Sequence, residues 1–198
     1  MDATPEVEVP HHHKTGNRKL DLILAVSAFV ISLVSVFLAI ENAVAMRHLV
    51  ASNSWPFVNV GVSDGNEAGN AALDLVIQNK GIGPAKIESL EVFYGGQPMR
   101  GGNALIHAMT GGKSIPFVRS RVVGSVLSAK ESVNFLSVVG QSVDPSDLLK
   151  LAKLSKGIAI RTCYCSVFDE CWLLDRTIAP SKLTEVDECP AAQVPFQV

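Results

Sequence analysis

The chain has 198 residues, a formal net charge of −2 and 18% charged residues. Lysine and arginine form no cluster interleaved with aromatic residues, so the electrostatic footprint of a nucleic-acid-binding protein is missing. Apart from an N-terminal tail and an apolar segment, about 145 residues remain, enough for one ordinary domain with a sizeable core.

An uncharged apolar run near the N-terminus is the strongest pattern in the chain. Residues 1–19, which precede it, have no periodic apolar pattern and are predicted to be a disordered tail. The run Leu22–Ile40 carries no charge and would extend about 28 Å as a helix, close to the hydrocarbon thickness of a bilayer. We therefore predict a transmembrane helix over residues 20–46, with the lipid bilayer as a partner.

A cleaved signal peptide is the alternative interpretation of this run. Ala43, Val44 and Ala45 have the small-x-small form of a cleavage site, and cleavage after Ala45 would release a secreted domain. The apolar run is longer than the roughly 7–15 residues of a signal core, and the helical pattern continues through Leu49 and Val50. These features favour a retained anchor.

The charges beside the run predict its orientation. Lys14, Arg18 and Lys19 lie just before it, whereas Arg47 alone lies close behind it. Because cytoplasmic flanks carry the excess of cations, we expect a cytoplasmic N-terminus and a C-terminal domain that is periplasmic or extracellular. The predicted location is the cell (inner) membrane.

Small residues recur along one face of the predicted helix at alternating spacings of three and four. Small side chains let helix backbones approach closely, which favours association in lipid, although alanine and serine are also common in membrane helices that do not associate. This face predicts helix packing with a protein partner or with a second copy of the chain. Its members are Ala25, Ala28, Ser32, Ser35, Ala39 and Asn42.

Short apolar runs separated by turn residues follow a helical stalk over residues 47–55. Trp55-Pro56 ends the stalk, because the residue before proline is pushed out of the α region. Strands of a β-sandwich domain are predicted over residues 56–178, followed by a C-terminal tail, residues 179–198, that is packed or tied by Cys189. The expected strands are 57–62, 72–78, 87–94, a hairpin of 120–127 with 132–139, and a last hairpin of 158–167 with 171–174.

Two short helices are expected within this mainly β domain. One covers residues 103–109. The other begins near Asp144, which can cap it, with Pro145 at the first helical position and Asp147 near the positive end of the helix dipole, and it ends before Gly157. The predicted fold is therefore an N-terminal transmembrane helix followed by a β-sandwich with one or two short helices.

No catalytic, cofactor or metal constellation is found in the sequence. The segment from Gly111 to Ser114 resembles the end of a P-loop, but the pattern requires glycine where His107 stands, so we read a surface turn. His107 has no nucleophile elbow and no second histidine at metal-binding spacing to work with. We predict a protein without catalysis or cofactor.

The segment Asn79–Ala85 resembles the N-x-G-x-G-P-A turn of bacterial immunoglobulin-like β-domains. Gly81 and Gly83 are expected there to serve positive φ. With the anchor, the stalk, the Trp-Pro pair and a closing hairpin at Tyr164–Trp172, the layout resembles uncharacterised bacterial single-pass membrane proteins. The resemblance implies a C-terminal immunoglobulin-like domain and brings no known activity. Asp169 stands near the hairpin tip, where glycine is frequent in such proteins.

All four cysteines lie near the C-terminus, and in an exported domain an even count favours disulfides. Free buried thiols and a metal site are the alternatives, although the spacing lacks paired Cys-x2-Cys motifs. If the last hairpin turns at residues 167–169, Cys165 faces Cys171 across it. Cys163 would then pair with Cys189.

The leading functional hypothesis is an anchored extracytoplasmic β-domain that binds a protein partner or an envelope component without catalysis. The alternative is an accessory or sensor subunit of a membrane complex that acts through the transmembrane helix. A secreted domain with a cleaved signal peptide is third. Nucleic acid is not an expected partner.

Overall fold

The computed structural model describes residues 16–63, 71–140 and 143–197. The chain divides into two compact units, residues 1–49 and 50–198. Most of the predicted disordered tail, residues 1–15, lies outside the described residues. The first helix begins at Arg18, so residues 18 and 19 of the predicted tail are helical.

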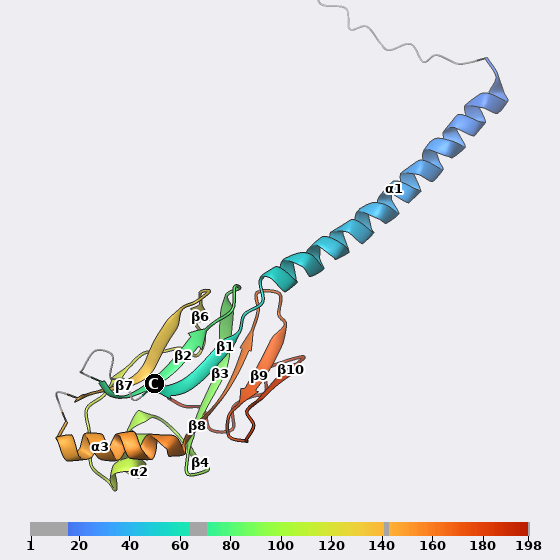
Figure 1. Cartoon of the computed structure of the whole chain (residues 1–198). Coiled ribbons are helices and arrows are strands. Elements are labelled where there is room, and N and C mark those ends of the chain that lie inside the picture. The colour runs from blue at the N-terminus through green and yellow to red at the C-terminus, as the bar shows by residue number, and fades with distance from the viewer. Residues whose placement is uncertain (1–15, 64–70, 141–142, 198) are drawn as a thin grey trace, which may run out of the picture. The chain divides into compact units, whose positions relative to one another are not determined.

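Helix α1 covers Arg18–Asn53 without a break, so the predicted membrane segment and the predicted stalk are one helix (Figure 1). None of its side chains is buried within the protein. By length and composition it is a candidate membrane span, and a signal sequence near the N-terminus has the same properties. Two serines on it satisfy their hydroxyls locally, because Ser27 donates to the Leu24 carbonyl (2.9 Å) and Ser35 to that of Ile31 (2.8 Å).

The first of two antiparallel sheets has the strand order β1-β2-β7-β5. Alternating residues of these strands point into the core, as in β1, where Val58 and Val60 are buried. The strands are β1 (Val58–Ser63), β2 (Ala71–Asn79), β7 (Ser132–Val139) and β5 (Val118–Arg119).

The second sheet has the order β10-β9-β8-β3-β4, and β6 pairs with β3 beside this path. Most of the β8 side chains are buried, and this strand lies in the middle of the sheet. The strands are β3 (Ala85–Tyr94), β4 (Gln97–Met99), β6 (Val126–Leu127), β8 (Ile158–Cys165), β9 (Cys171–Asp175) and β10 (Lys182–Val186).

The predicted hairpin of residues 120–127 with 132–139 is wrong. Val126 and Leu127 pair instead with the start of β3 in the second sheet, whereas β7 pairs with β2 and β5 in the first. Two backbone bonds hold this crossing segment against Ile87, whose N–H donates to the Ser125 carbonyl while its carbonyl accepts from Gly124 (3.0 and 2.8 Å). Gly124 has a φ of 77°, which turns the chain toward the second sheet.

Both short helices form close to the predicted positions. Helix α2 covers Gly102–Thr110, and helix α3 covers Pro145–Leu154, followed by a 3-10 turn over Ser155–Gly157. Asp144 precedes α3 but makes no side-chain capping bond, contrary to the prediction. Asp147 in the first turn instead binds a lysine, as described below.

A single hydrophobic core takes buried side chains from both sheets and from both short helices. The C-terminal segment belongs to this core: β10 extends the second sheet, and Phe196 is buried with its N–H donating to the Leu90 carbonyl (3.0 Å). Burying such a ring stabilises the fold by about 1.5–3 kcal/mol. The whole chain is mixed rather than mainly β, with 35% helix and 34% strand, because α1 alone supplies 36 helical residues.

Candidate functional site: the aromatic junction

Asn79, at the end of β2, organises the turn that follows it. Its buried side-chain amide donates to the carbonyls of Gly83 (2.7 Å), Leu127 (3.2 Å) and Ser128 (3.2 Å). Its carbonyl oxygen accepts from the N–H groups of Gly81 (3.0 Å) and Phe57 (3.2 Å). One amide thus fastens three chain segments, because buried polar groups are stable only when they are paired.

The two glycines of this turn are needed for close approach and not for positive φ, which corrects the prediction. A Cβ on Gly81 would lie 2.5 Å from the carbonyl oxygen of Trp55. A Cβ on Gly83 would overlap the carbonyl oxygen of Ser54. The absence of side chains lets the segment after α1 lie directly on the turn, and its Trp55 carbonyl accepts bonds from Ile82 (3.2 Å) and Gly83 (3.3 Å).

Four aromatic side chains meet where this segment enters the β-domain; we call them the aromatic junction. The ring centroids of Trp55 and Trp172 are 6.2 Å apart in an edge-on arrangement, and those of Trp55 and Phe57 are 5.9 Å apart. Tyr164 lies 5.7 Å from Trp172 and is fully buried. Each such pair contributes about 0.5–1.5 kcal/mol beyond the area that it buries.

Burial raises the pKa of the Tyr164 hydroxyl, which faces the backbone of Val58 without reaching hydrogen-bonding geometry. A neutral phenol inside the core is suited to packing and not to proton transfer at ordinary pH. The buried half of the junction is therefore structural. Its exposed half is formed by Trp55 and Phe57, which are 44% and 39% exposed.

A hollow of about 330 Å³ lies beside the two indoles. Trp55 and Trp172 form its aromatic wall, and Glu170 and Glu185 are its charged residues. Glu185 sits directly opposite Trp172 in the β9–β10 pairing, so its position is determined by strand register. The remaining lining residues are Ala51 and Ser52.

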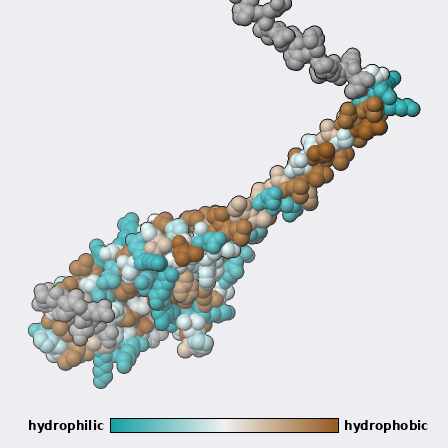
Figure 2. Space-filling view, turned by 45° about the horizontal axis from the view of Figure 1, so that its top comes forward, coloured by the Kyte–Doolittle hydropathy of each residue, from teal (hydrophilic) through white to brown (hydrophobic). Residues whose placement is uncertain are grey.

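Further exposed apolar side chains lie on the loops at this end of the β-domain. Ile82 in the glycine turn is 61% exposed, Val126 in β6 is 56% exposed, and Val167 in the β8–β9 turn is 50% exposed. The loops are tied together, because Lys86 pairs with Val126 in the backbone and its ammonium lies 3.4 Å from the carboxylate of Asp169. Figure 2 shows one face of the protein coloured by hydropathy, in which hydrophobic and hydrophilic residues lie side by side on the surface of the β-domain.

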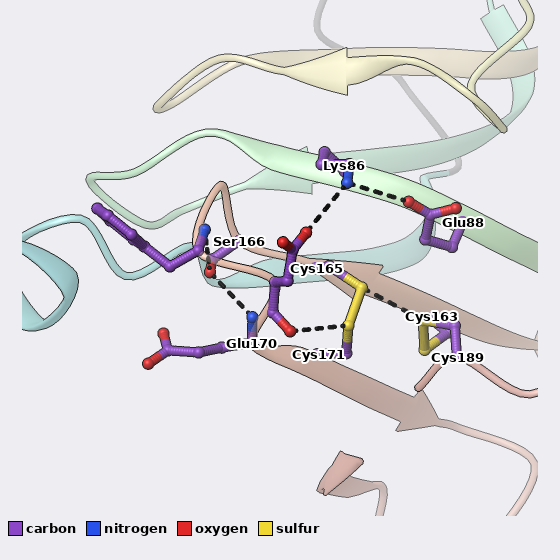
Figure 3. Close-up of polar contacts among 10 residues, drawn as sticks. Lys86, Glu88, Cys163, Cys165, Ser166, Glu170, Cys171 and Cys189 are labelled. Carbon is purple, nitrogen blue, oxygen red and sulfur yellow. Dashed lines mark hydrogen bonds and ion pairs between the residues drawn. A yellow bond between two sulfur atoms is a disulfide. The ribbon is translucent and has the colours of Figure 1, made fainter. Parts of the chain in front are cut away.

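Two disulfides involve the second sheet, because three of the four cysteines lie in β8 and β9, and Cys189 follows β10 (Figure 3). They join Cys163 to Cys189 and Cys165 to Cys171, which are the two predicted pairs; the hairpin register predicted the second, and the first was predicted as the remaining pair. The sulfur of Cys165 also lies 3.7 Å from that of Cys189, so the two bonds are neighbours. Each described cysteine is therefore in a disulfide and none is a free ligand for a metal.

The turn between β8 and β9 is closed by a backbone bond, in which the Ser166 N–H donates to the Glu170 carbonyl at 2.7 Å. The Ser166 hydroxyl accepts from the N–H groups of Phe168 (3.1 Å) and Glu170 (3.3 Å). Asp169 has a φ of 62°, a conformation that glycine adopts without strain. Its carboxylate lies 3.4 Å from the ammonium of Lys86.

Cys189 ties the C-terminal segment to β8 as predicted, but the sequence analysis did not predict a second attachment through Glu91. The buried carboxylate of Glu91 accepts from the N–H groups of Gln193 (3.0 Å) and Val194 (3.2 Å), and its other oxygen lies 3.5 Å from Arg161. Arg161 also binds Asp175 at 3.1 Å. A charged residue inside a strand pattern was the available signal, since such residues are rarely buried without partners.

The residues near the P-loop-like segment form a surface turn. Gly111 and Gly112 have φ values of 72° and 100° at the end of α2, and His107 is exposed on that helix. The ammonium of Lys113 lies 2.8 Å from the carboxylate of Asp147 on α3. Its hydrogen bond lowers the pKa of the Asp147 carboxyl, and the same bond raises the pKa of Lys113.

The small-residue face of α1 is exposed along its whole length, as are the other side chains of that helix between Arg18 and Val50. Nothing in the described structure covers it, so helix association stays a prediction. The face consists of Ala25, Ala28, Ser32, Ser35, Ala39 and Asn42.

A family model described as a domain of unknown function, DUF8453, matches residues 22–166. The match begins within α1 and ends in the β8–β9 turn, so it includes the glycine turn and Trp55 but not Cys171, Trp172 or Cys189. No curated protein and no solved structure matches the chain.

Proposed function

We propose that this chain, which belongs to the DUF8453 family, is a membrane-anchored β-domain that binds a protein partner or an envelope component outside the cytoplasm, without catalysis. The observation that carries the proposal is the group of exposed apolar side chains on the tied loops at the junction end. Single exposed apolar residues are normal, but several at one end of a domain are typical of an interaction surface.

The anchor in this proposal is α1, retained as a membrane helix with a cytoplasmic N-terminus. Its uncharged run matches the bilayer thickness, and its cations are concentrated on the N-terminal side. The domain would then lie in the periplasm or outside the cell, where disulfides persist. The two disulfides agree with that compartment.

We also infer an immunoglobulin-like relationship for the β-domain. The strand orders β1-β2-β7-β5 and β9-β8-β3-β4 correspond to the A-B-E-D and G-F-C-C′ orders of that fold when the strands are taken in chain order. Helices α2 and α3 would be insertions in this scheme, and β10 an added edge strand. The shared core supports two sheets that face each other.

Site-specific photo-crosslinking in cells tests the binding function. A photoreactive residue at Ile82 or Val167 is expected to give a discrete product with a second protein. Leu149 on α3 is the matched control, because it is 74% exposed and apolar but belongs to a different element. Products of equal yield at Leu149, or no product at either junction position, would contradict the proposal.

The second candidate, an accessory or sensor subunit acting through the helix, is favoured by one observation. Residues 54–57, which follow α1, are held by the Asn79 turn through backbone bonds at both Trp55 and Phe57. A displacement of residues 54–57 would therefore also displace the turn at Asn79, which is buried in the β-domain. Replacing Ala28 and Ser35 with leucine in the full chain should abolish partner crosslinking under this candidate and leave it intact under the first.

A further inference from the structure

The hollow beside the two indoles has the chemistry of a site for an organic cation; this inference deepens the proposed binding function and rests on it. Trp172 is 8% exposed and held by Tyr164, whereas Trp55 is 44% exposed at an interplanar angle of 65° to it. The indole face is the aromatic surface that attracts cations most strongly. Two indoles at such an angle offer a face and an edge to one bound group.

The two carboxylates of the hollow are available to a ligand. Within residues 16–63, 71–140 and 143–197, no hydrogen bond or ion pair involves the side-chain oxygens of Glu170 or Glu185, and both residues are exposed. Other acids of the domain, such as Glu91, Asp147 and Asp175, bind cationic side chains of the chain itself. Glu170 and Glu185 therefore leave negative charge beside an aromatic wall.

We propose that this hollow binds the cationic side chain of a lysine or arginine presented by a protein partner. The alkyl part of such a side chain would pack on the indoles while its charged end meets the carboxylates. Charge-assisted bonds to carboxylates are the stronger kind of hydrogen bond. The volume of about 330 Å³ accommodates one such side chain.

A lipid amine has the same charge, but the exposed apolar side chains of Ile82 and Val167 at the same end of the β-domain favour a protein partner.

Intrinsic fluorescence provides a local assay, because the chain has only two tryptophans and both line the hollow. The full chain is purified in a maltoside detergent, which has no cationic group, and titrated with N-acetyl-lysine amide. A saturable change at about millimolar concentration is expected. N-acetyl-norleucine amide, which lacks the charge, is the matched ligand and is expected to give no saturable change.

The double variant Glu170→Gln with Glu185→Gln should weaken lysine-amide binding by about fivefold to tenfold, the effect of two exposed charge pairs. Glu188→Gln is the matched control, since Glu188 is exposed near the same strand but outside the hollow, and it should bind like the unchanged chain. Equal responses to both ligands, or unchanged affinity in the double variant, would overturn the inference. So would the lack of any saturable response.

Two further measurements distinguish failure of the cation site from failure of the proposed binding function. A fluorescence change that requires ethanolamine-headgroup lipid in a nanodisc, and that lysine amide does not produce, would assign the hollow to lipid and overturn the protein side chain. If the crosslinks at Ile82 persist while lysine amide has no effect, the cation site fails and the binding function stands. If the crosslinks are absent while lysine amide binds with the stated selectivity, the apolar surface fails and the cation site stands.

Discussion

Gly83→Ala should be among the most damaging small substitutions in the β-domain. The added methyl group would overlap the backbone carbonyl of Ser54, so the segment after α1 must move away from the turn. Moving this backbone is costly because it breaks the hydrogen bonds that the backbone makes, whereas the end of a flexible side chain can rotate away. The bonds at risk are those from Ile82 and Gly83 to the Trp55 carbonyl.

The magnitude follows from these two costs. Overpacking of a tight site costs about 1–3 kcal/mol, and each lost hydrogen bond about 0.5–1.5 kcal/mol. Partial relaxation makes the two costs overlap, so we expect the free energy of unfolding to fall by about 2–4 kcal/mol. With a denaturant dependence near 2 kcal/mol per molar urea, the unfolding midpoint should fall by about 1–2 M.

Urea titration of the full chain, followed by tryptophan fluorescence, measures this change because Trp55 and Trp172 both report on the junction. Gly61→Ala is the matched control, since a Cβ there would meet only the guanidinium of Arg176 at 3.6 Å, an ordinary contact. The free energy of unfolding of this control should change by less than about 0.5 kcal/mol. If Gly83→Ala is as mild as Gly61→Ala, close approach does not explain the glycine turn.

Three other predictions rest on the disulfides, on the charges that flank the apolar run of α1, and on the pair of Lys113 with Asp147. Non-reducing peptide mapping of exported protein should recover Cys163 linked to Cys189 and Cys165 linked to Cys171; four free thiols would contradict both the pairing and the compartment. A reporter that is active only outside the cytoplasm, fused to the C-terminus, should be active, and a bright cytoplasmic reporter at the same site would reverse the proposed orientation. Because a bonded lysine lowers the pKa of Asp147, that carboxylate adds stability above its ordinary pKa near 4 and loses it as the pH falls through the lowered value. Asp147→Asn should therefore flatten the acid limb of the stability profile, and an unchanged limb would show that the pair contributes nothing.

Features that depend on neighbours in sequence could be predicted from the chain itself. The apolar run of α1, the two short helices and the closing hairpin were identified because helical and strand periods are local properties. The Cys165–Cys171 pair follows from the same locality, since a short turn places its flanking residues opposite each other. Immunoglobulin-like topology and membrane insertion remain proposals.

Other features were decided only by tertiary structure. The alternation of apolar and polar residues over 120–127 does not predict that Val126 pairs with the second sheet. Such alternation shows which face of a strand is buried, and it does not show which strand pairs with it. The glycine turn was recognised, but its reason was not, since Ser54 and Gly83 meet only after the chain folds back. Likewise Trp55 and Glu185 lie far apart in the sequence of the domain. The hollow that they share exists because strand pairing brings β10 beside Trp172.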